Sequence, residues 1–214
     1  MALRIPPGRA GRTWLVGRLE IARRGAELLD RKRQALLREQ APVSNEADAA
    51  RRAWRDAAER AELWSARAAV LDGAGRLELL ARHVDQPATL EVRRSNLMGA
   101  RLLSLDAVDV PEPLPVSALG GSSAAVIAAR ACGEATQAAA RWAVSEHAEH
   151  ELSAELGRTA RRLRGLRDRW IPDLEAALAD LNLVLDENQR EQAARVRWLM
   201  RRQGPSRSSA SSRP

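Results

Sequence analysis

An unbroken heptad pattern runs through the first third of the chain and limits what the chain can fold into. Between residues 15 and 71 the register positions recur at alternating steps of four and three residues, and all are apolar except Arg33 and Gln40. Three to four sustained heptads already favour a coiled coil over an ordinary surface helix, and this pattern keeps its phase across Pro42. It predicts one long helix over residues 12–72, bent at Pro42, where the ring removes a backbone hydrogen bond.

The last third of the chain carries a second heptad pattern. Its register runs from Leu152 to Trp170 and then gains one extra step of four beside Pro172. Such an insertion is a stutter, which locally unwinds a coiled coil, and we expect a second bend there. A helix of about 60 residues is about 90 Å long and needs a partner of similar length to cover its seam. We therefore expect residues 12–72 to lie antiparallel against about 142–201, as a rod.

These patterns predict a mainly α fold. The N- and C-terminal helices would form a long antiparallel two-helix coiled coil, and a small central cap would contain a β-hairpin and a short helix. The residues expected to fill the coiled-coil seam are Leu15, Leu19, Ala22, Ala26, Leu29, Leu36, Trp54, Trp64, Leu163, Leu166, Trp170, Leu174, Leu178, Leu181 and Leu185.

The middle of the chain has the composition of smaller elements. Residues 89–108 hold two partly alternating runs around Met98-Gly99, which predicts a β-hairpin. Residues 76–83 have the pattern of a short helix, and the stretch 120–123, Gly-Gly-Ser-Ser, predicts a helix start near residue 123. The expected division is 1–11 as an N-terminal extension, 12–72 as the first coiled-coil helix, 73–141 as the cap with the start of the second long helix, 142–203 as the C-terminal coiled-coil helix, and 204–214 as a disordered, Ser-rich tail.

No arrangement of residues predicts catalysis, a cofactor or a metal. Lys32 has no phosphate-binding glycine loop before it. His147 and His150 share a helix face, but the sequence offers no second such pair to complete four ligands, and we expect His83 to be structural. Cys132 is the only cysteine, which excludes an internal disulfide and is typical of a reducing compartment. We expect a non-catalytic chain without cofactor or metal.

The location expected from the sequence is the cytoplasm. No stretch approaches the length of apolar residues that a transmembrane helix needs. The first 12 residues contain arginines but no apolar stretch of signal-peptide length.

The net charge of +7 is unevenly distributed along the chain. Residues 1–40 hold 10 basic and 4 acidic side chains, residues 155–214 hold 13 and 8, and the middle, 41–154, holds 12 and 16. In an antiparallel coiled coil the two basic ends would lie together at one tip. Lys32 is the sole lysine beside 34 arginines, a bias typical of a GC-rich coding sequence.

Several segments resemble the D subunit of the V-type and A-type rotary ATPases. In residues 24–36, RGAELLDRKRQAL, a Gly, a Leu-Leu pair and a Lys-Arg pair are similar to that family's N-terminal helix. Residues 161–166, RRLRGL, then Ile171-Pro172, then residues 185–191, LDENQRE, are similar to its C-terminal helix. The expected hairpin with Met98-Gly99 resembles the family's middle segment.

The resemblance implies a central-stalk rotor subunit. Its coiled coil would turn inside the hexameric head of catalytic and regulatory A and B subunits, and its base would join the small F subunit of the stalk and the connector to the membrane ring. It would carry torque between ATP turnover and ion translocation, peripheral to the cell membrane and without inserting into it. We hypothesise that the catalytic-head interface is a basic tip surface, held to the stator by weak, screened contacts, and formed by Arg23, Arg24, Arg31, Arg190, Arg195, Arg197 and Arg201.

Two other functions remain open from the sequence. A generic coiled-coil adaptor or assembly protein would share the heptads but would self-associate through them. A nucleic-acid-binding protein would share the sequence pI of about 11.1, but acidic side chains interleave with the arginines and no recognition helix or stacking motif is present.

Overall fold

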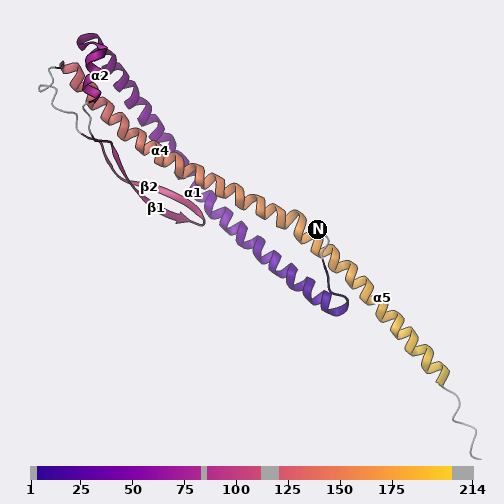
Figure 1. Cartoon of the computed structure of the whole chain (residues 1–214). Helices are drawn as coiled ribbons and strands as arrows, with labels where there is room; N and C mark the ends of the chain where they lie inside the picture. Colours follow the sequence, from indigo (N-terminus) through magenta and orange to yellow (C-terminus); the bar gives the residue numbers. More distant parts are fainter. Residues whose placement is uncertain (1–3, 83–85, 112–120, 204–214) are drawn as a thin grey trace, which may run out of the picture. The chain divides into compact units, whose positions relative to one another are not determined.

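The computed structural model describes residues 4–82, 86–111 and 121–203. The chain divides into two compact units, one formed by residues 1–30 and 161–214 and the other by residues 31–160. Its elements are helix α1 (Gly8–Asp72), helix α2 (Ala74–Arg82), strand β1 (Thr89–Leu97), strand β2 (Ala100–Asp109), helix α4 (Ser123–Arg164), the π-helix η1 (Gly165–Trp170) and helix α5 (Ile171–Gln203) (Figure 1). The predicted mainly α fold with a hairpin and a short helix is confirmed.

Helix α1 is 65 residues long and continues through Pro42. A proline has no N–H, so the carbonyl of Arg38 has no partner at this position of the helix ladder. Both residues are exposed, and water can take the place of the missing donor. The bend expected at Pro42 stays a prediction.

The stutter expected beside Pro172 coincides with η1. In this π turn the N–H of Ile171 donates to the carbonyl of Leu166, five residues back. Pro172 cannot donate to Asp168 four residues back, and the wider turn is how the helix accommodates the proline. Helix α5 then begins at Ile171.

The unit made of residues 1–30 and 161–214 is an antiparallel helix pair. Leu15 and Leu174 are fully buried at its centre, together with Leu19 and Ala22. Ile171, Leu178 and Leu181 are among the half-buried residues that extend this core along α5. Beyond Leu181, helix α5 continues past the start of α1 (Figure 1), and most of its side chains over residues 183–203 are exposed.

The unit made of residues 31–160 holds a second antiparallel pair, α1 against α4. At one end, Ala68 packs against Ala124, Ala125 and Ala128. Farther along, the rings of Trp54 and Trp142 stack with their centroids 4.6 Å apart. Small alanines allow the two helix backbones to approach closely, and the stacked indoles fill a wider part of the same interface.

The pairing differs from the one expected from the heptads. Residues 12–72 are opposed by about 124–181 rather than 142–201, because the alanine-rich start of α4 already packs against the end of α1. The second helical run is therefore the longer one, and its surplus lies at the C-terminal end of α5.

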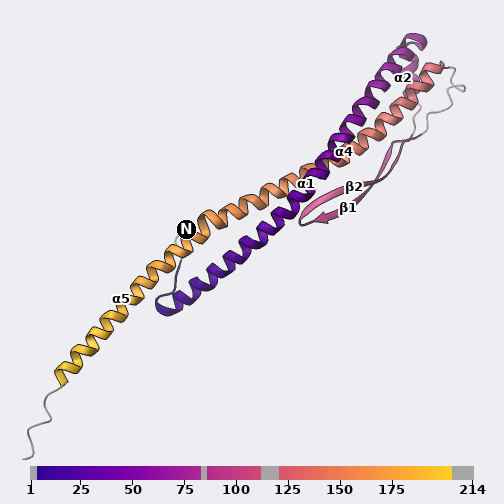
Figure 2. The same cartoon turned by 180° about the vertical axis from the view of Figure 1, so that it is seen from behind.

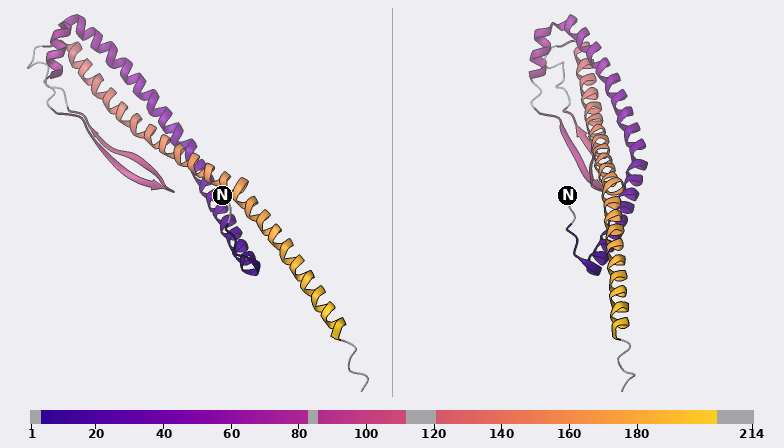
Figure 3. Two further views of the ribbon diagram at one scale, coloured as in Figure 1. Left: turned by 45° about the vertical axis from the view of Figure 1, so that its right-hand side comes forward. Right: turned by 90° about the vertical axis from the view of Figure 1, so that its right-hand side faces the viewer.

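Strands β1 and β2 form a two-stranded antiparallel sheet that lies beside α4 (Figures 2 and 3). Leu97 pairs with Ala100, so Met98 and Gly99 form a two-residue turn. Both have positive φ, 50° and 95°, which is the geometry of a type I′ turn. Asn96 Oδ1 closes the turn by accepting a hydrogen bond of 2.7 Å from the Gly99 N–H.

The ends of α1 and α4 are tied together by Asp72. Its carboxylate accepts hydrogen bonds from the backbone N–H of Ser122, at 3.1 Å, and from the Ser122 hydroxyl, at 2.6 Å. The same hydroxyl accepts from the Ala125 N–H and caps the start of α4. One carboxylate thus links the last residue of one long helix to the first turn of the other.

Candidate functional site

The exposed C-terminal part of α5 carries four of the seven arginines expected at a partner interface. Arg190 and Arg195 have side chains 78% exposed and pair with Glu187 and Glu191 on their own helix, at 3.5 and 3.6 Å. Arg197 donates to the carbonyl of Ala193, and Arg201 is exposed. Contacts of this kind within one helix leave the outer faces of the guanidinium groups open to a partner.

Large apolar side chains are exposed on the same part of α5. They are Leu183, Val184, Val196, Trp198, Leu199 and Met200, each about half exposed or more. Positions 190, 197 and 201 are separated by seven and four residues and so share one helix face, whereas the apolar residues are spread around the helix. Arginine, tryptophan and methionine are enriched in protein–protein interfaces. The composition of this exposed part of α5 is therefore typical of a surface that a partner covers.

The other three arginines of the expected interface lie on α1. Arg23 makes an ion pair of 2.7 Å with Glu175 across the helix pair, and Arg24 pairs with Glu20 on α1. Arg190 lies 15 residues beyond Glu175, about 22 Å farther along α5. Arg31 belongs to the other unit. Within the unit of residues 1–30 and 161–214, the expected arginines form an α5 group and a separate pair on α1, because α5 extends beyond α1, and the expected catalytic-head interface stays a prediction.

The residues expected in the coiled-coil seam have low exposure, with one exception. Each is buried or half-buried except Trp170, which is 37% exposed. Trp170 is the last residue of η1, and the π turn rotates it out of the heptad register. Its seam neighbours Leu163 and Leu174, on either side of η1, are buried.

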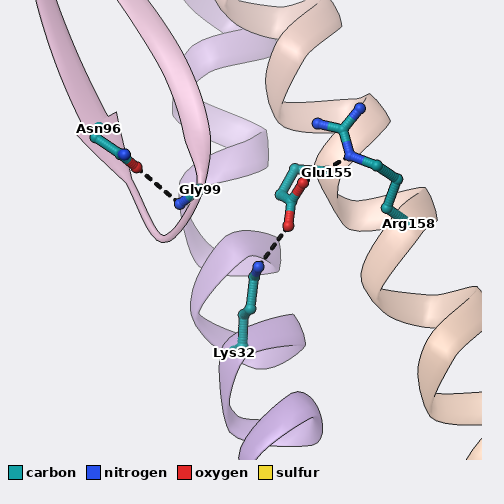
Figure 4. A network of polar contacts seen from close by, with 5 residues as sticks. All are labelled: Lys32, Asn96, Gly99, Glu155 and Arg158. Atoms are coloured by element: carbon teal, nitrogen blue, oxygen red, sulfur yellow. Dashed lines mark hydrogen bonds and ion pairs between the residues drawn. The ribbon is translucent and has the colours of Figure 1, made fainter.

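A second polar site, which heptad reasoning did not single out, lies on the other unit. Lys32 Nζ on α1 donates to Glu155 Oε1 on α4, and Arg158 Nε donates to Glu155 Oε2 at 2.7 Å. The hairpin turn lies over this cluster (Figure 4). A Cβ at Gly99 would be 3.5 Å from both Glu155 Oε1 and Lys32 Nζ.

The surroundings of this cluster are apolar. Leu36, Ala100 and Leu152 are almost fully buried beside it. Glu155 is 7% exposed and is the one buried carboxylate in the part of the chain that the structure describes. The hydrogen bond from Lys32 holds the pKa of Glu155 below its ordinary value, against burial, which raises it, and with help from Arg158. The carboxylate is therefore charged and doubly paired at neutral pH.

The candidate metal ligands do not form a site in the described ranges. His147 and His150 are exposed on α4, and no group of three or more His, Cys, Asp or Glu residues outside the undescribed segments is arranged to hold a metal ion. Cys132 is exposed, with its sulfur 3.8 Å from the Ser65 hydroxyl. His83 and the tail from residue 204 lie outside the described residues.

No helix in the described part of the chain has the length and apolar character required to cross a membrane.

Comparison with known proteins identifies the family. The family model that describes the D subunit of ATP synthase matches residues 13–201. The chain belongs to the ATP synthase D subunit family. The A-type ATP synthase D subunit of Pyrococcus horikoshii is 31% identical over 201 residues, covering 91% of this chain and 92% of that protein. The V-type ATP synthase D subunit of Thermus thermophilus is 29% identical over 181 residues, covering 85% and 81%. A V-type ATP synthase D subunit of Treponema pallidum is 28% identical over 210 residues, covering 94% and 96%.

Membership of the D subunit family confirms the resemblance drawn from the sequence motifs. The match to residues 13–201 includes both terminal helices and the hairpin. It makes the chain one of the components of a V-type or A-type ATP synthase, which assembles with other subunits of that complex. Within this D subunit, the exposed end of α5 is the candidate partner surface, and the cluster around Glu155 is the polar centre of the helix pair.

Proposed function

We propose that this chain is the rotor shaft of a V/A-type ATP synthase and carries torque between ATP turnover and ion translocation. The observation that supports this most is the length of uninterrupted helix. Helix α1 has 65 residues, about 100 Å along its axis, and the chain is helical without a break from Ser123 to Gln203. A shaft needs such length, whereas a compact adaptor does not.

Stiffness under load comes from the paired seams. An isolated helix bends easily, but two packed helices can bend or twist only if their seam side chains slide past one another. Leu15 and Leu174 in one unit, and Leu36 and Leu152 in the other, are almost fully buried knobs that resist this sliding. The protein itself needs no catalytic group for this role.

The proposed partners follow from the rotor role. The exposed end of α5 enters the head formed by the A and B subunits, where its arginines meet stator carboxylates. Exposed ion pairs are individually weak, so such contacts hold the shaft in the head without fixing it in one rotary position. The small F subunit of the stalk and the connector to the membrane ring bind elsewhere on the chain. The protein works at the cytoplasmic side of the membrane without inserting into it.

Co-expression with the A, B and F subunits from the same genome tests this proposal. We expect a complex with one copy of this chain per AB hexamer, measured by size-exclusion chromatography with mass analysis. A chain that self-associates and is absent from both the hexamer and an F complex would contradict the rotor role and favour a coiled-coil adaptor.

A further inference from the structure

We propose that Lys32, Glu155 and Arg158, covered by the hairpin turn, fix the axial register of α1 against α4, and that position 32 requires a lysine. This cluster is called the register lock below. The proposal concerns the isolated chain and does not depend on the rotor function.

The helix pair needs such a device because its seam is repetitive. At one end of the pair Ala68 packs against Ala124, Ala125 and Ala128, and the seam of α1 holds three more buried alanines, Ala47, Ala57 and Ala61. Small side chains at heptad spacing pack almost as well one heptad farther along. The alanine part of the seam therefore discriminates weakly between registers, and the stacked rings of Trp54 and Trp142 are a bulky apolar contact that a slip of one heptad would also break.

The register lock removes this ambiguity. A shift of α4 by seven residues would bring Lys32 level with Ala148 or with Arg162 instead of Glu155. The first leaves a buried carboxylate without its cation, and the second places two positive charges together. A buried charge that loses its partner is strongly destabilising, and specifying register is the best-attested use of buried polar groups in coiled coils.

The hairpin turn completes the register lock from outside. Gly99 lies so close to the ion pair that an added Cβ would be at van der Waals distance from Glu155 Oε1 and Lys32 Nζ, and Ala100 beside it has no exposed surface. The turn therefore limits the access of water to Lys32 and Glu155 and strengthens their interaction. Most of β1 is exposed. Of the hairpin, the turn is therefore the part whose packing depends on the alignment of α1 against α4.

The limited space around Glu155 explains why position 32 holds a lysine in a chain whose other basic residues are arginines. Arg158 already occupies Glu155 Oε2, and only the space between Oε1 and Gly99 remains (Figure 4). An ammonium group is compact, whereas a guanidinium is a broad planar fork. An arginine at position 32 would displace either the Arg158 contact or the hairpin turn.

Disulfide cross-linking measures the register directly. Ser65 on α1 faces Cys132, the only native cysteine, with 3.8 Å between Oγ and Sγ. Ser65→Cys therefore reports the native register, and a one-heptad slip of about 10 Å separates the two sulfurs. Ala58→Cys, seven residues earlier, reports a chain that has slipped in one direction.

We expect the Ser65→Cys chain to cross-link readily under mild oxidation, and the Ala58→Cys chain to cross-link poorly. In the Ser65→Cys chain, adding Glu155→Gln or Lys32→Met should remove most of the native cross-link. Adding Lys32→Arg should also remove most of it, although this change keeps the positive charge. The matched controls are Arg60→Lys and Glu134→Gln, which alter an exposed ion pair of 3.8 Å between the same two helices and should leave the cross-link unchanged. Circular dichroism confirms that each variant remains helical.

Native cross-linking in a helical Glu155→Gln chain would overturn the proposal and assign the register to the other contacts of the pair, the link between Asp72 and Ser122 and the stacked rings of Trp54 and Trp142. Native cross-linking in Lys32→Arg, together with its loss in Lys32→Met, would overturn the requirement for lysine.

Discussion

At the scale of single residues, Glu155 shows how a long coiled coil tolerates a buried charge. Burial opposes the ionised carboxylate, but Lys32 and Arg158 each occupy one of its oxygens. The outcome is a pKa lowered from the ordinary value of 4.5, which means that folding favours the charged form. The ion pair therefore contributes to stability only while Glu155 is ionised.

This gives a pH prediction with a definite sign. The folded pKa lies below the unfolded one, so the contribution is complete above about pH 4.5 and is lost as the pH falls through the folded pKa. Glu155→Gln should lower the free energy of unfolding at pH 7 by about 2–4 kcal/mol, somewhat less than for a fully buried pair, because the Lys32 side chain is 25% exposed. It should also flatten the acid side of the stability profile, measured by urea denaturation between pH 3 and 7. If the free energy of unfolding of Glu155→Gln fell with decreasing pH as steeply as that of the unchanged chain, the pH dependence could not be assigned to Glu155.

Gly99 provides a second test at the residue scale. Its φ of 95° is accessible to glycine but strained for alanine. Gly99→Ala should destabilise the hairpin by about 1 kcal/mol or more, and amide exchange at Ala100 should become faster. Gly17→Ala, in the interior of α1 where the structure has open space, is the control and should be neutral or stabilising. Equal effects of the two changes would argue against the turn geometry.

At the scale of elements, heptad spacing predicted the two long helices because burial on one face repeats with the helix itself. It also located the stutter that the structure resolves as η1, since an inserted step changes that repeat. Spacing could not align one helix against the other, because the alanines of residues 124–131 satisfy the same pattern as the later leucines. Nor could it place Glu155 beneath the hairpin, which depends on contacts between segments far apart in sequence. The one available signal was the single lysine among 34 arginines.

The seam itself can be tested with buried and exposed leucines of one helix. Leu36 is fully buried and Leu28 is 64% exposed on α1. Leu36→Ala should cost about 2–5 kcal/mol through lost burial and the cavity left behind, whereas Leu28→Ala should change the free energy of unfolding by about 0.5 kcal/mol or less. Urea denaturation followed by circular dichroism measures both. Similar losses for the two variants would contradict the seam assignment.

At the scale of the whole molecule, the exposed end of α5 is where partner binding and folding can be separated. Replacing Arg190, Arg195, Arg197 and Arg201 together by glutamine removes four positive charges from a surface outside the core. We expect the isolated chain to keep its stability, while its affinity for the AB hexamer falls and depends less on salt. Replacing Arg51 and Arg82, exposed on α1 and α2, is the control. Unchanged hexamer binding by the fourfold variant would remove these arginines from the interface.

The rotor role is tested most directly by watching the chain turn. Cys132 is exposed and is the only cysteine, so a bead can be attached there after accessible cysteines of the other subunits are replaced. With the AB hexamer fixed to a surface, we predict continuous rotation of the bead in one direction when ATP is added, and its arrest when ATP is removed. A complex that contains this chain and hydrolyses ATP at full rate while the bead stays still would contradict torque transmission.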